Sequence, residues 1–205
     1  MFTANTMNCV AETTGLALPW NGTIPAVSAD RIRLAKQSGM QVMKLLADNL
    51  TPRKIVSEKS VANAVAVDMA LGGSSNTVLH LPAVFREAKL PLSLEIFDEI
   101  SRKTPNLCQL SPAGSAHIED RHAAGGIPAV RAELLAGDLI HGTALSVTGK
   151  TVGENLLEIQ AKINDPEVIH PLSEPYSEEG GIAILKGSLA PEGAVVKQFA
   201  VLPSM

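Results

Sequence analysis

Aromatic side chains are scarce in this sequence: phenylalanine, tryptophan and tyrosine together make up 3% of the 205 residues. This scarcity argues against an aromatic-rich β-sandwich, which normally fills its core with such side chains. Small and aliphatic residues supply most of the 45% hydrophobic fraction instead, and they favour helices packed on strands. The composition therefore predicts an α/β fold.

Cysteine is also scarce: the chain contains two cysteines, Cys9 and Cys108, and they do not form a CxxC motif. This pattern argues against both a disulfide framework and a self-contained zinc site. The N-terminus lacks a basic stretch followed by an apolar core, and no run of 18 uncharged apolar residues is present. We therefore expect a cytoplasmic, reducing location and no membrane partner.

Positive charge is not in excess either, because 17 lysines and arginines face 21 aspartates and glutamates, for a net charge of -4. A protein that binds along a nucleic-acid duplex needs basic residues to neutralise phosphates. Nucleic acid is therefore not an expected partner. The chain is long enough to bury a substantial core without disulfide or metal support.

Apolar residues at helical spacing are abundant in the first 162 residues. The stretch 30–48 predicts an amphipathic helix with Asp30 as a cap, and its apolar positions are Ile32, Ala35, Met40, Met43 and Leu46. Further helices are predicted at 57–71, 75–88, 92–103, 127–137 and from Thr151 onward. Pro82 would kink the third of these six, whereas Thr151 and Glu154 form a capping-box pattern in the last.

The remainder of the chain has a different character. Residues 104–124 are irregular apart from a predicted short strand at 107–110. We predict part of a helix-rich α/β domain over 1–163, a proline-containing linker over 164–179, and the start of an all-β domain over 180–205. In that last part, strands at 182–185 and 194–201 flank a Pro-Glu-Gly turn, and two strands alone bury too little surface to be stable.

The segment LGGSSNTVLH, residues 71–80, is one place that could bind a ligand. Its glycine pair permits a tight turn, and Ser74, Ser75 and Asn76 then offer donors at the start of a helix, where the dipole favours an anion. The same pattern also fits a simple joint between two helices, capped by glycine and serine.

A second glycine pair, in AAGGIPAV at residues 123–130, fits a helix start at least as well as an anion site. The histidine pair in HIEDRH, at positions 117 and 122, does not have the i,i+3 or i,i+4 spacing of zinc ligands on a helix. Neither pattern identifies a reaction.

Several long blocks of the chain together resemble, in order, the middle of the dihydroxy-acid/6-phosphogluconate dehydratase family. These blocks are MFTANTMNCVAETTGLALPWNGTIPAV, VDMALGGSSNTVLHLPAV, AAGGIPAV, VTGKTVGENL and GGIAILKGSLAPEGAVVKQFAV. The resemblance covers essentially all 205 residues. The IPAV and LAPEGAVVK blocks are more similar to the member of branched-chain amino-acid biosynthesis than to the sugar-acid dehydratases.

The resemblance implies a hydro-lyase that converts a 2,3-dihydroxy carboxylic acid to a 2-keto acid. It implies a homodimer, with an iron-sulfur cluster as Lewis acid, a Mg²⁺ ion that holds the substrate, and a serine base. It also implies the fold, a helix-rich N-terminal domain followed by the first strands of a β-barrel-like C-terminal domain.

The same resemblance implies that most of this equipment lies outside the chain. The third cluster cysteine would fall three positions ahead of Met1, with the other cysteines and two magnesium ligands further upstream. The remaining magnesium-binding glutamate and the serine base would follow Met205. Cys9 is expected to be a small buried residue rather than a ligand. We therefore expect an inactive internal fragment that binds neither cofactor and contains no catalytic residue.

Two groups of residues are candidates to line the active site. Thr3 and Asn5 would follow the cluster cysteine closely, and Ser74, Ser75 and Asn76 form the glycine loop. A free-standing module that binds a small carboxylate is the alternative from another functional class. In either case, unpaired strand edges and uncovered apolar surface predict that the fragment associates with itself.

Overall fold

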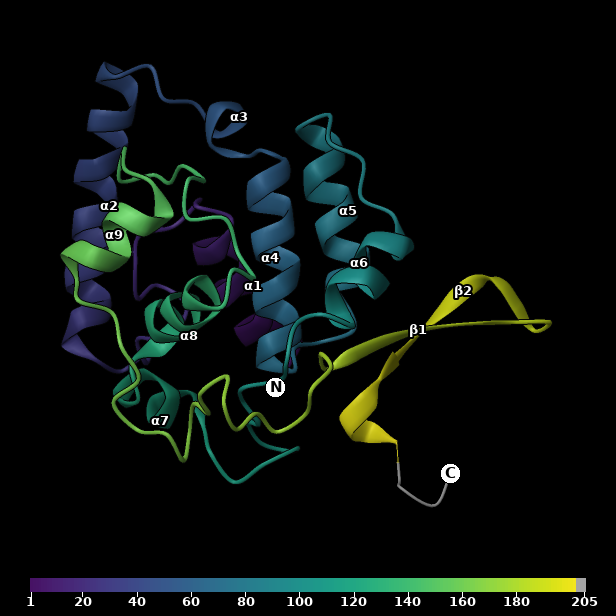
Figure 1. Cartoon of the computed structure of the whole chain (residues 1–205). Coiled ribbons are helices and arrows are strands. Elements are labelled where there is room, and N and C mark those ends of the chain that lie inside the picture. Colours follow the sequence, from purple (N-terminus) through teal and green to yellow (C-terminus); the bar gives the residue numbers. More distant parts are fainter. Residues whose placement is uncertain (202–205) are drawn as a thin grey trace.

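Helices form most of the first 158 residues of the computed structural model, which describes residues 1–201 (Figure 1). In this part of the chain the helices are α1 Thr3–Thr13, α2 Ala29–Ala47, α3 Pro52–Ile55, α4 Glu58–Leu71, α5 Thr77–Glu87, α6 Leu94–Ser101, α7 Ile118–Ala123, α8 Gly126–Ala136 and α9 Val152–Glu158. A two-stranded antiparallel sheet, β1 Ile182–Gly187 and β2 Ala190–Lys197, follows them. The expected order, a helix-rich part followed by strands, is confirmed.

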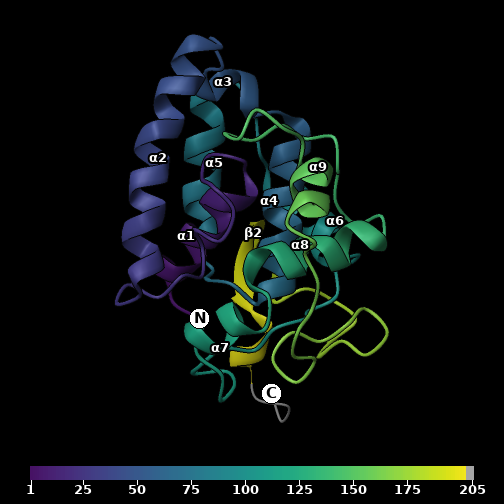
Figure 2. The ribbon, with the colours of Figure 1, turned by 90° about the vertical axis from the view of Figure 1, so that its left-hand side faces the viewer.

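Helix α4 lies at the centre of the helical body, between α1, α6 and α8 (Figures 1 and 2). Every residue of α4 from Ser60 to Leu71 except Ala62 is buried, so this helix is enclosed on all sides. Ser57 and Ser60 form a capping box at its start, and Gly72 ends it in the left-handed conformation with φ +57°. Both hydrophobic clusters of the core include α4 residues, so this helix joins them.

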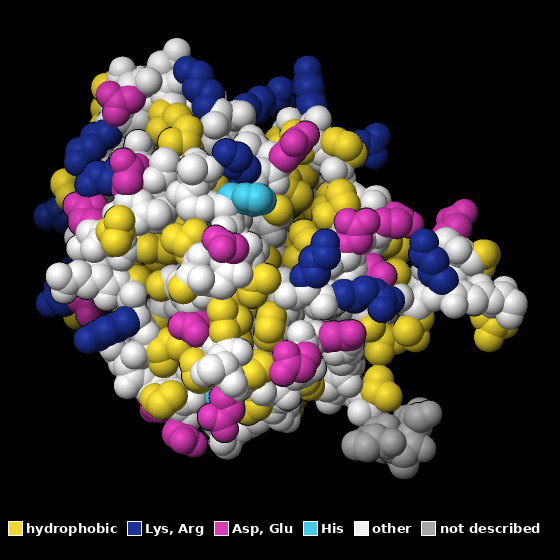
Figure 3. Space-filling view, viewed as in Figure 1, with side chains coloured by type: hydrophobic (Ala, Val, Ile, Leu, Met, Phe, Trp, Pro, Cys, Tyr) yellow, Lys and Arg dark blue, Asp and Glu magenta, His cyan; other side chains and the backbone are white. Residues whose placement is uncertain are grey.

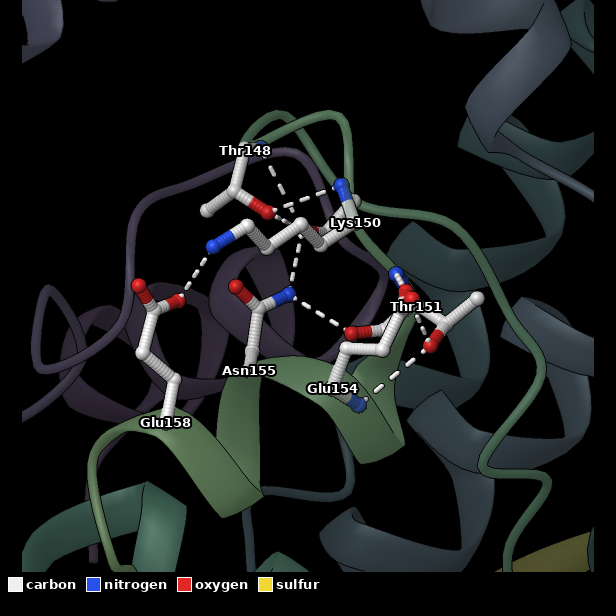
Figure 4. Close-up of polar contacts among 7 residues, drawn as sticks. Thr148, Lys150, Thr151, Glu154, Asn155 and Glu158 are labelled. Atoms are coloured by element: carbon white, nitrogen blue, oxygen red, sulfur yellow. Dashed lines mark hydrogen bonds and ion pairs between the residues drawn. The ribbon is translucent and has the colours of Figure 1, made fainter.

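The capping box predicted at α9 is present (Figure 4). The Glu154 N–H donates to Thr151 Oγ1 over 3.3 Å, and the Glu154 carboxylate accepts from the Thr151 N–H over 2.7 Å. Asn155 adds a hydrogen bond to the Ser146 hydroxyl at 3.0 Å, which ties the helix to the preceding loop. Local sequence therefore fixes where this helix begins.

Helix α2 matches its prediction in extent, but its cap and its orientation differ. Ser28, not Asp30, is the cap, because its hydroxyl accepts the Asp30 N–H. Leu34 is the buried residue of α2, and the Gln41 amide on the same side donates to the Val147 carbonyl. All five predicted apolar positions are exposed instead: Ile32, Ala35, Met40, Met43 and Leu46. The apolar face of α2 is thus exposed, and the helix itself lies along the left edge of Figure 1.

The prediction of a strand at 107–110 is wrong. The N–H groups of Leu107 and Cys108 both donate to the Ala70 carbonyl, at 2.8 and 3.1 Å. This segment therefore satisfies the end of α4 rather than a neighbouring strand, and it forms only isolated bridges at Asn106 and Leu110. Helices α3 and α7 were not predicted, since both are too short to show periodicity.

The strand pair differs from its prediction in the turn. Gly187 pairs with Ala190, so the chain reverses at 188–189, and the Pro-Glu-Gly stretch lies inside β2. The end of the predicted second strand, Gln198–Ala200, is instead a 3₁₀ helix. The hairpin projects from the body (Figure 1), and Figure 3 shows apolar side chains on it. Leu185 and Leu189 of the hairpin are both exposed.

Residues 164–179 run over the surface of the helical body in turns and bends. The Asn164 N–H donates to the Ala124 carbonyl, the His170 N–H donates to the Leu107 carbonyl, and Ile169 is fully buried. This segment is therefore packed against the body along its length. The three domain ranges given above stay predictions.

Candidate functional site

A pocket of about 420 Å³ lies where the start of α1, the loop before α5 and the end of β2 meet. It is lined by Met1, Phe2, Thr3, Ser74, Ser75, Asn76, Pro112, Ala113, Lys197, Phe199 and Ala200. Four segments that are far apart in the sequence therefore contribute to one cavity.

Four of the five candidate residues line this pocket together. The hydroxyl groups of Thr3 and Ser74 are hydrogen-bonded at 3.0 Å, and the Asn76 amide donates to Thr3 Oγ1 at 2.7 Å. Ser75 lies beside them in the same loop. Asn5 is exposed on the next part of α1 and is not among the lining residues, so its role stays a prediction.

The loop before α5 is shaped by the glycine pair. Gly72 ends α4, and a Cβ on Gly73 would lie 1.9 Å from Asp68 Oδ1, so any other residue at the second position would displace the Asp68 carboxylate. The next residue, Ser74, then donates its N–H to Thr6 Oγ1 over 3.1 Å. The loop is thereby fastened to α1, which explains why the two predicted groups meet.

The pocket favours an anion. Helix α1 has no side-chain cap at its N-terminus, and Thr3 of its first turn lines the cavity together with Asn76, the residue before α5. In α5 the N–H groups of Thr77, Val78 and Leu79 already donate to the preceding loop, so the unpaired helical N–H groups at this pocket are those of α1. The first N–H groups of a helix lack partners within the helix, and its dipole places partial positive charge there. Lys197 adds a full positive charge at the end of β2, with its ammonium 3.4 Å from the Met1 carbonyl oxygen. The prediction from sequence did not include Lys197.

Asp68 lies directly behind the glycine loop and is fully buried. Its Oδ2 accepts the Thr77 hydroxyl at 2.6 Å, whereas its Oδ1 is buried with no hydrogen-bond partner. Burial raises the pKa of this carboxyl group from 3.8 to about 7, although the Thr77 hydrogen bond and the Lys197 charge act in the opposite direction. Nothing in the local sequence distinguishes this carboxylate, because the VDMAL stretch is typical of an ordinary buried helix.

The second glycine pair serves packing rather than binding. A Cβ on Gly125 would lie 2.5 Å from both the Ala129 Cβ and the Lys162 carbonyl oxygen, and one on Gly126 would lie 2.7 Å from Thr23 Oγ1. The pair thus lets the start of α8 approach its neighbours, which supports the interpretation as a helix start.

The residues described do not form a ligand set for an iron-sulfur cluster or for Mg²⁺. Between residues 1 and 201 no three histidine, cysteine or acidic side chains come together as metal ligands would. Both cysteines are buried, and the Cys9 thiol donates to the Gly22 carbonyl at 3.4 Å. Burial raises the pKa of Cys9 to about 12, which disfavours the thiolate that a cluster requires.

None of the helices described in residues 1–201 combines the length and the apolar character that crossing a bilayer requires. The longest, α2, has 19 residues and carries several charges.

Comparison with known proteins gives matches over nearly the whole chain. The family model "Dihydroxy-acid/6-phosphogluconate dehydratase N-terminal" matches residues 1–155, and the corresponding C-terminal model matches residues 167–205. Curated proteins named dihydroxy-acid dehydratase are 69% identical in Nitratidesulfovibrio vulgaris strain Miyazaki F, 68% in Oleidesulfovibrio alaskensis and 60% in Moorella thermoacetica. Each match covers all 205 residues of the chain and 37% of the relative.

The chain therefore spans little more than a third of the length of these relatives. The two family models occur in the same order along the chain as the helical body and the strand pair. These matches show that the chain belongs to the dihydroxy-acid/6-phosphogluconate dehydratase family.

Proposed function

We propose that the chain is part of a hydro-lyase that converts a branched 2,3-dihydroxy carboxylic acid to a 2-keto acid in branched-chain amino-acid biosynthesis. The observation that carries this proposal is the identity of 60–70% over all 205 residues to proteins named dihydroxy-acid dehydratase. The family also contains 6-phosphogluconate dehydratases, so a sugar-acid substrate is the alternative within the same chemistry.

The pocket suits one part of that substrate, its carboxylate group. Dehydration removes a proton from C2 and hydroxide from C3, and the resulting enol tautomerises to the keto acid. As the C2 proton leaves, negative charge spreads onto the carboxylate, where donors fixed in advance stabilise it. Thr3, Ser74, Ser75, Asn76 and Lys197 are the groups of this chain that we propose for this role. We assign no catalytic acid or base to it.

The family resemblance implies an iron-sulfur cluster and Mg²⁺, and these belong to the proposal for the whole protein. When bound, they would supply a Lewis acid for the leaving hydroxyl and a clamp for the substrate. Since the described residues offer no ligand set, the proposal places neither group on this chain, and the chain alone is expected to be inactive. The two free, buried cysteines support a reducing cytoplasmic location.

A substrate comparison in the whole protein that contains this chain tests the proposal. We expect 2,3-dihydroxy-3-methylbutanoate to be converted with a kcat/KM about a hundredfold higher than gluconate or 6-phosphogluconate, because a site shaped for a branched apolar chain discriminates by that order. Keto-acid formation, followed as the phenylhydrazone, is the measurement. A preference for either sugar acid would replace the proposed substrate, and no turnover of any would favour a binding module.

The role of the glycine loop can be tested separately with Asn76→Ala in the same protein. Loss of a hydrogen bond to a charged group costs about 1.5–3 kcal/mol, so we expect KM for the dihydroxy acid to rise roughly ten- to a hundredfold. Ser75→Ala should act in the same direction. Ser188→Ala, an exposed serine in the hairpin turn, is the control and should leave KM unchanged. Unchanged kinetic constants in both loop variants would remove the loop from the site.

A further inference from the structure

Thr77, the first residue of α5, connects the buried Asp68 to the glycine loop. Its hydroxyl oxygen lies 2.6 Å from Asp68 Oδ2 and 2.8 Å from the Ser74 carbonyl oxygen. A hydroxyl group has one proton and donates fully to only one of two acceptors. Because both contacts have hydrogen-bond length, a second proton must lie between Thr77 and one of these neighbours. A backbone carbonyl has no proton to give, so the second proton belongs to Asp68.

The other oxygen of Asp68 fits the same assignment. Oδ1 is buried without a hydrogen-bond partner and packs against Gly73, where an added Cβ would lie 1.9 Å from it. Burial without a partner is very costly for an ionised oxygen and much less so for the carbonyl oxygen of a neutral carboxylic acid. The pKa of Asp68, which burial raises to about 7, agrees with a bound proton below neutral pH.

We propose that protonated Asp68 is a positioning residue of the candidate site: it donates to Thr77, Thr77 donates to the Ser74 carbonyl, and the loop is thereby held ready for an anion. This role rests on the proposed function, in which the anion is the carboxylate of the dihydroxy acid. We call Asp68, Thr77 and Ser74 the Asp68 relay. The Ser74 hydroxyl lies 3.0 Å from Thr3 Oγ1, so the relay reaches the lining of the pocket.

Loss of the proton would weaken anion binding in two ways. Thr77 would turn its hydroxyl to the ionised Asp68, and the Ser74 carbonyl would keep only the Thr77 N–H, at 3.0 Å. A negative charge would also lie directly behind the loop that receives the anion, where like charges repel. Lys197 acts on Asp68 as well as lining the pocket, so an ionised Asp68 would compete with the ligand for its positive charge.

Other charged groups around α4 face Asp68 less directly than Lys197 does. Glu12 of α1 accepts backbone N–H groups of the loop that follows α1, and Arg131 of α8 acts on Glu12. The acidic residues of α6 lie at or near the surface. His80 lies one turn beyond Thr77 on α5 and is partly exposed. All of these groups stay in place when Asp68 is replaced, so a comparison of variants removes their contribution.

The pH dependence of KM in the whole protein that contains this chain tests the relay. The substrate carboxylate stays ionised above pH 6, so its own titration does not contribute. We expect KM for 2,3-dihydroxy-3-methylbutanoate to rise about tenfold between pH 6.5 and pH 8.5 in the wild type, within the limit of roughly tenfold per pH unit for one linked proton. Asp68→Asn should keep the low KM at both pH values, because its amide NH₂ replaces the protonated oxygen. The pH profile of kcat should be the same in both proteins.

Thr77 provides a matched pair of variants. Thr77→Val removes the hydroxyl group and should raise KM at pH 6.5 about tenfold, whereas Thr77→Ser keeps the hydroxyl and should stay within about twofold of wild type. Asp48→Asn makes the same carboxylate-to-amide change at an exposed position and should leave KM and its pH dependence unchanged. Equal pH dependence in wild type and Asp68→Asn, or a high KM of Asp68→Asn at both pH values, would overturn the proposal.

Infrared difference spectroscopy separates the relay from the proposed function. At pH 6 the spectrum of the wild type minus that of Asp68→Asn should contain the carbonyl band of a protonated carboxylic acid, and this band should be lost above pH 8. Absence of the band at pH 6 would overturn the relay, whichever acid the protein converts. Turnover of no dihydroxy acid would overturn the proposed function, and the band would then still decide whether Asp68 is protonated in the fold.

Discussion

Asp68→Asn is expected to raise the free energy of unfolding at pH 8 by roughly 2–4 kcal/mol. Raising the pKa of this carboxyl group from 3.8 to about 7 corresponds to about 4 kcal/mol at most. Asp68 is fully buried, and its Oδ1 has no hydrogen-bond partner. At pH 8 the folded protein must therefore keep a poorly compensated negative charge in its interior. The amide keeps the shape and an acceptor for the Thr77 hydroxyl, but it carries no charge.

The expected pH dependence follows from the direction of the shift. Burial raises the pKa of Asp68 from 3.8 in the unfolded chain to about 7 in the fold, so the folded state binds the proton more tightly. Stability is therefore full below pH 4 and falls as the pH rises toward 7. Burial also raises the pKa of Glu12 to about 7. Glu12 therefore adds to the loss of stability with rising pH, and it does so equally in the wild type and in the variant.

Urea unfolding between pH 4 and pH 8 measures this effect. We expect the difference between Asp68→Asn and wild type to grow with pH and to level off above pH 7. Asp48→Asn, which changes an exposed carboxylate at the end of α2, is the control and should shift stability by less than about 0.5 kcal/mol at every pH. A difference for Asp68→Asn that does not depend on pH would contradict the assignment of a buried, raised-pKa carboxyl group.

Local signals in the sequence were sufficient for the ends and the order of most helices. Ser57, Gly72 and the Thr151–Glu154 pair mark helix boundaries through hydrogen bonds within a few residues, and each works as predicted. The strands at the C-terminus were also recognisable, because short β-rich runs stand out after a helical region. The overall order of elements is therefore encoded locally.

Features that depend on distant contacts could not be predicted in the same way. Periodicity identified the apolar side of α2, but not that this side would face outward. The Pro-Glu-Gly stretch has the composition of a turn, yet the pairing of Gly187 with Ala190 places the reversal earlier. Both outcomes depend on what the segment packs against, which short windows of sequence do not contain.

The candidate pocket contains residues that local sequence identified and one that depends on distant contacts. The glycine loop at Ser74–Asn76 was recognisable as a possible anion site, and the family resemblance added Thr3. Lys197 was not recognisable, because it reaches the pocket only through the hairpin register that sets where β2 ends. The position of the hairpin on the helical body therefore decides whether the pocket contains its positive charge.

Gly181 determines that position, and Gly181→Ala is expected to lower the free energy of unfolding by about 2–3 kcal/mol, the usual range for added volume in a packed interior. A Cβ at residue 181 would lie 2.5 Å from the Gly72 Cα, a backbone atom at the end of α4 that cannot rotate away. The Gly181 N–H also donates to the Met69 carbonyl at 3.1 Å, and the Gly181 carbonyl accepts the Gln198 N–H at 3.0 Å. Relief of the clash must therefore stretch contacts that hold both strands to the body.

Gly187→Ala, at the far end of β1 from Gly181, provides the matched control, because a Cβ there meets no atom within 4 Å. We expect its effect to be within about 0.5 kcal/mol in denaturant unfolding, as for most exposed substitutions. In the whole protein, Gly181→Ala should also raise KM for the acid, since a displaced β2 moves Lys197 away from the pocket. Equal stability of the two variants would show that the hairpin is not seated on α4 in this way. A loss of stability in Gly181→Ala without any change in KM would separate the hairpin contact from the positive charge of the pocket.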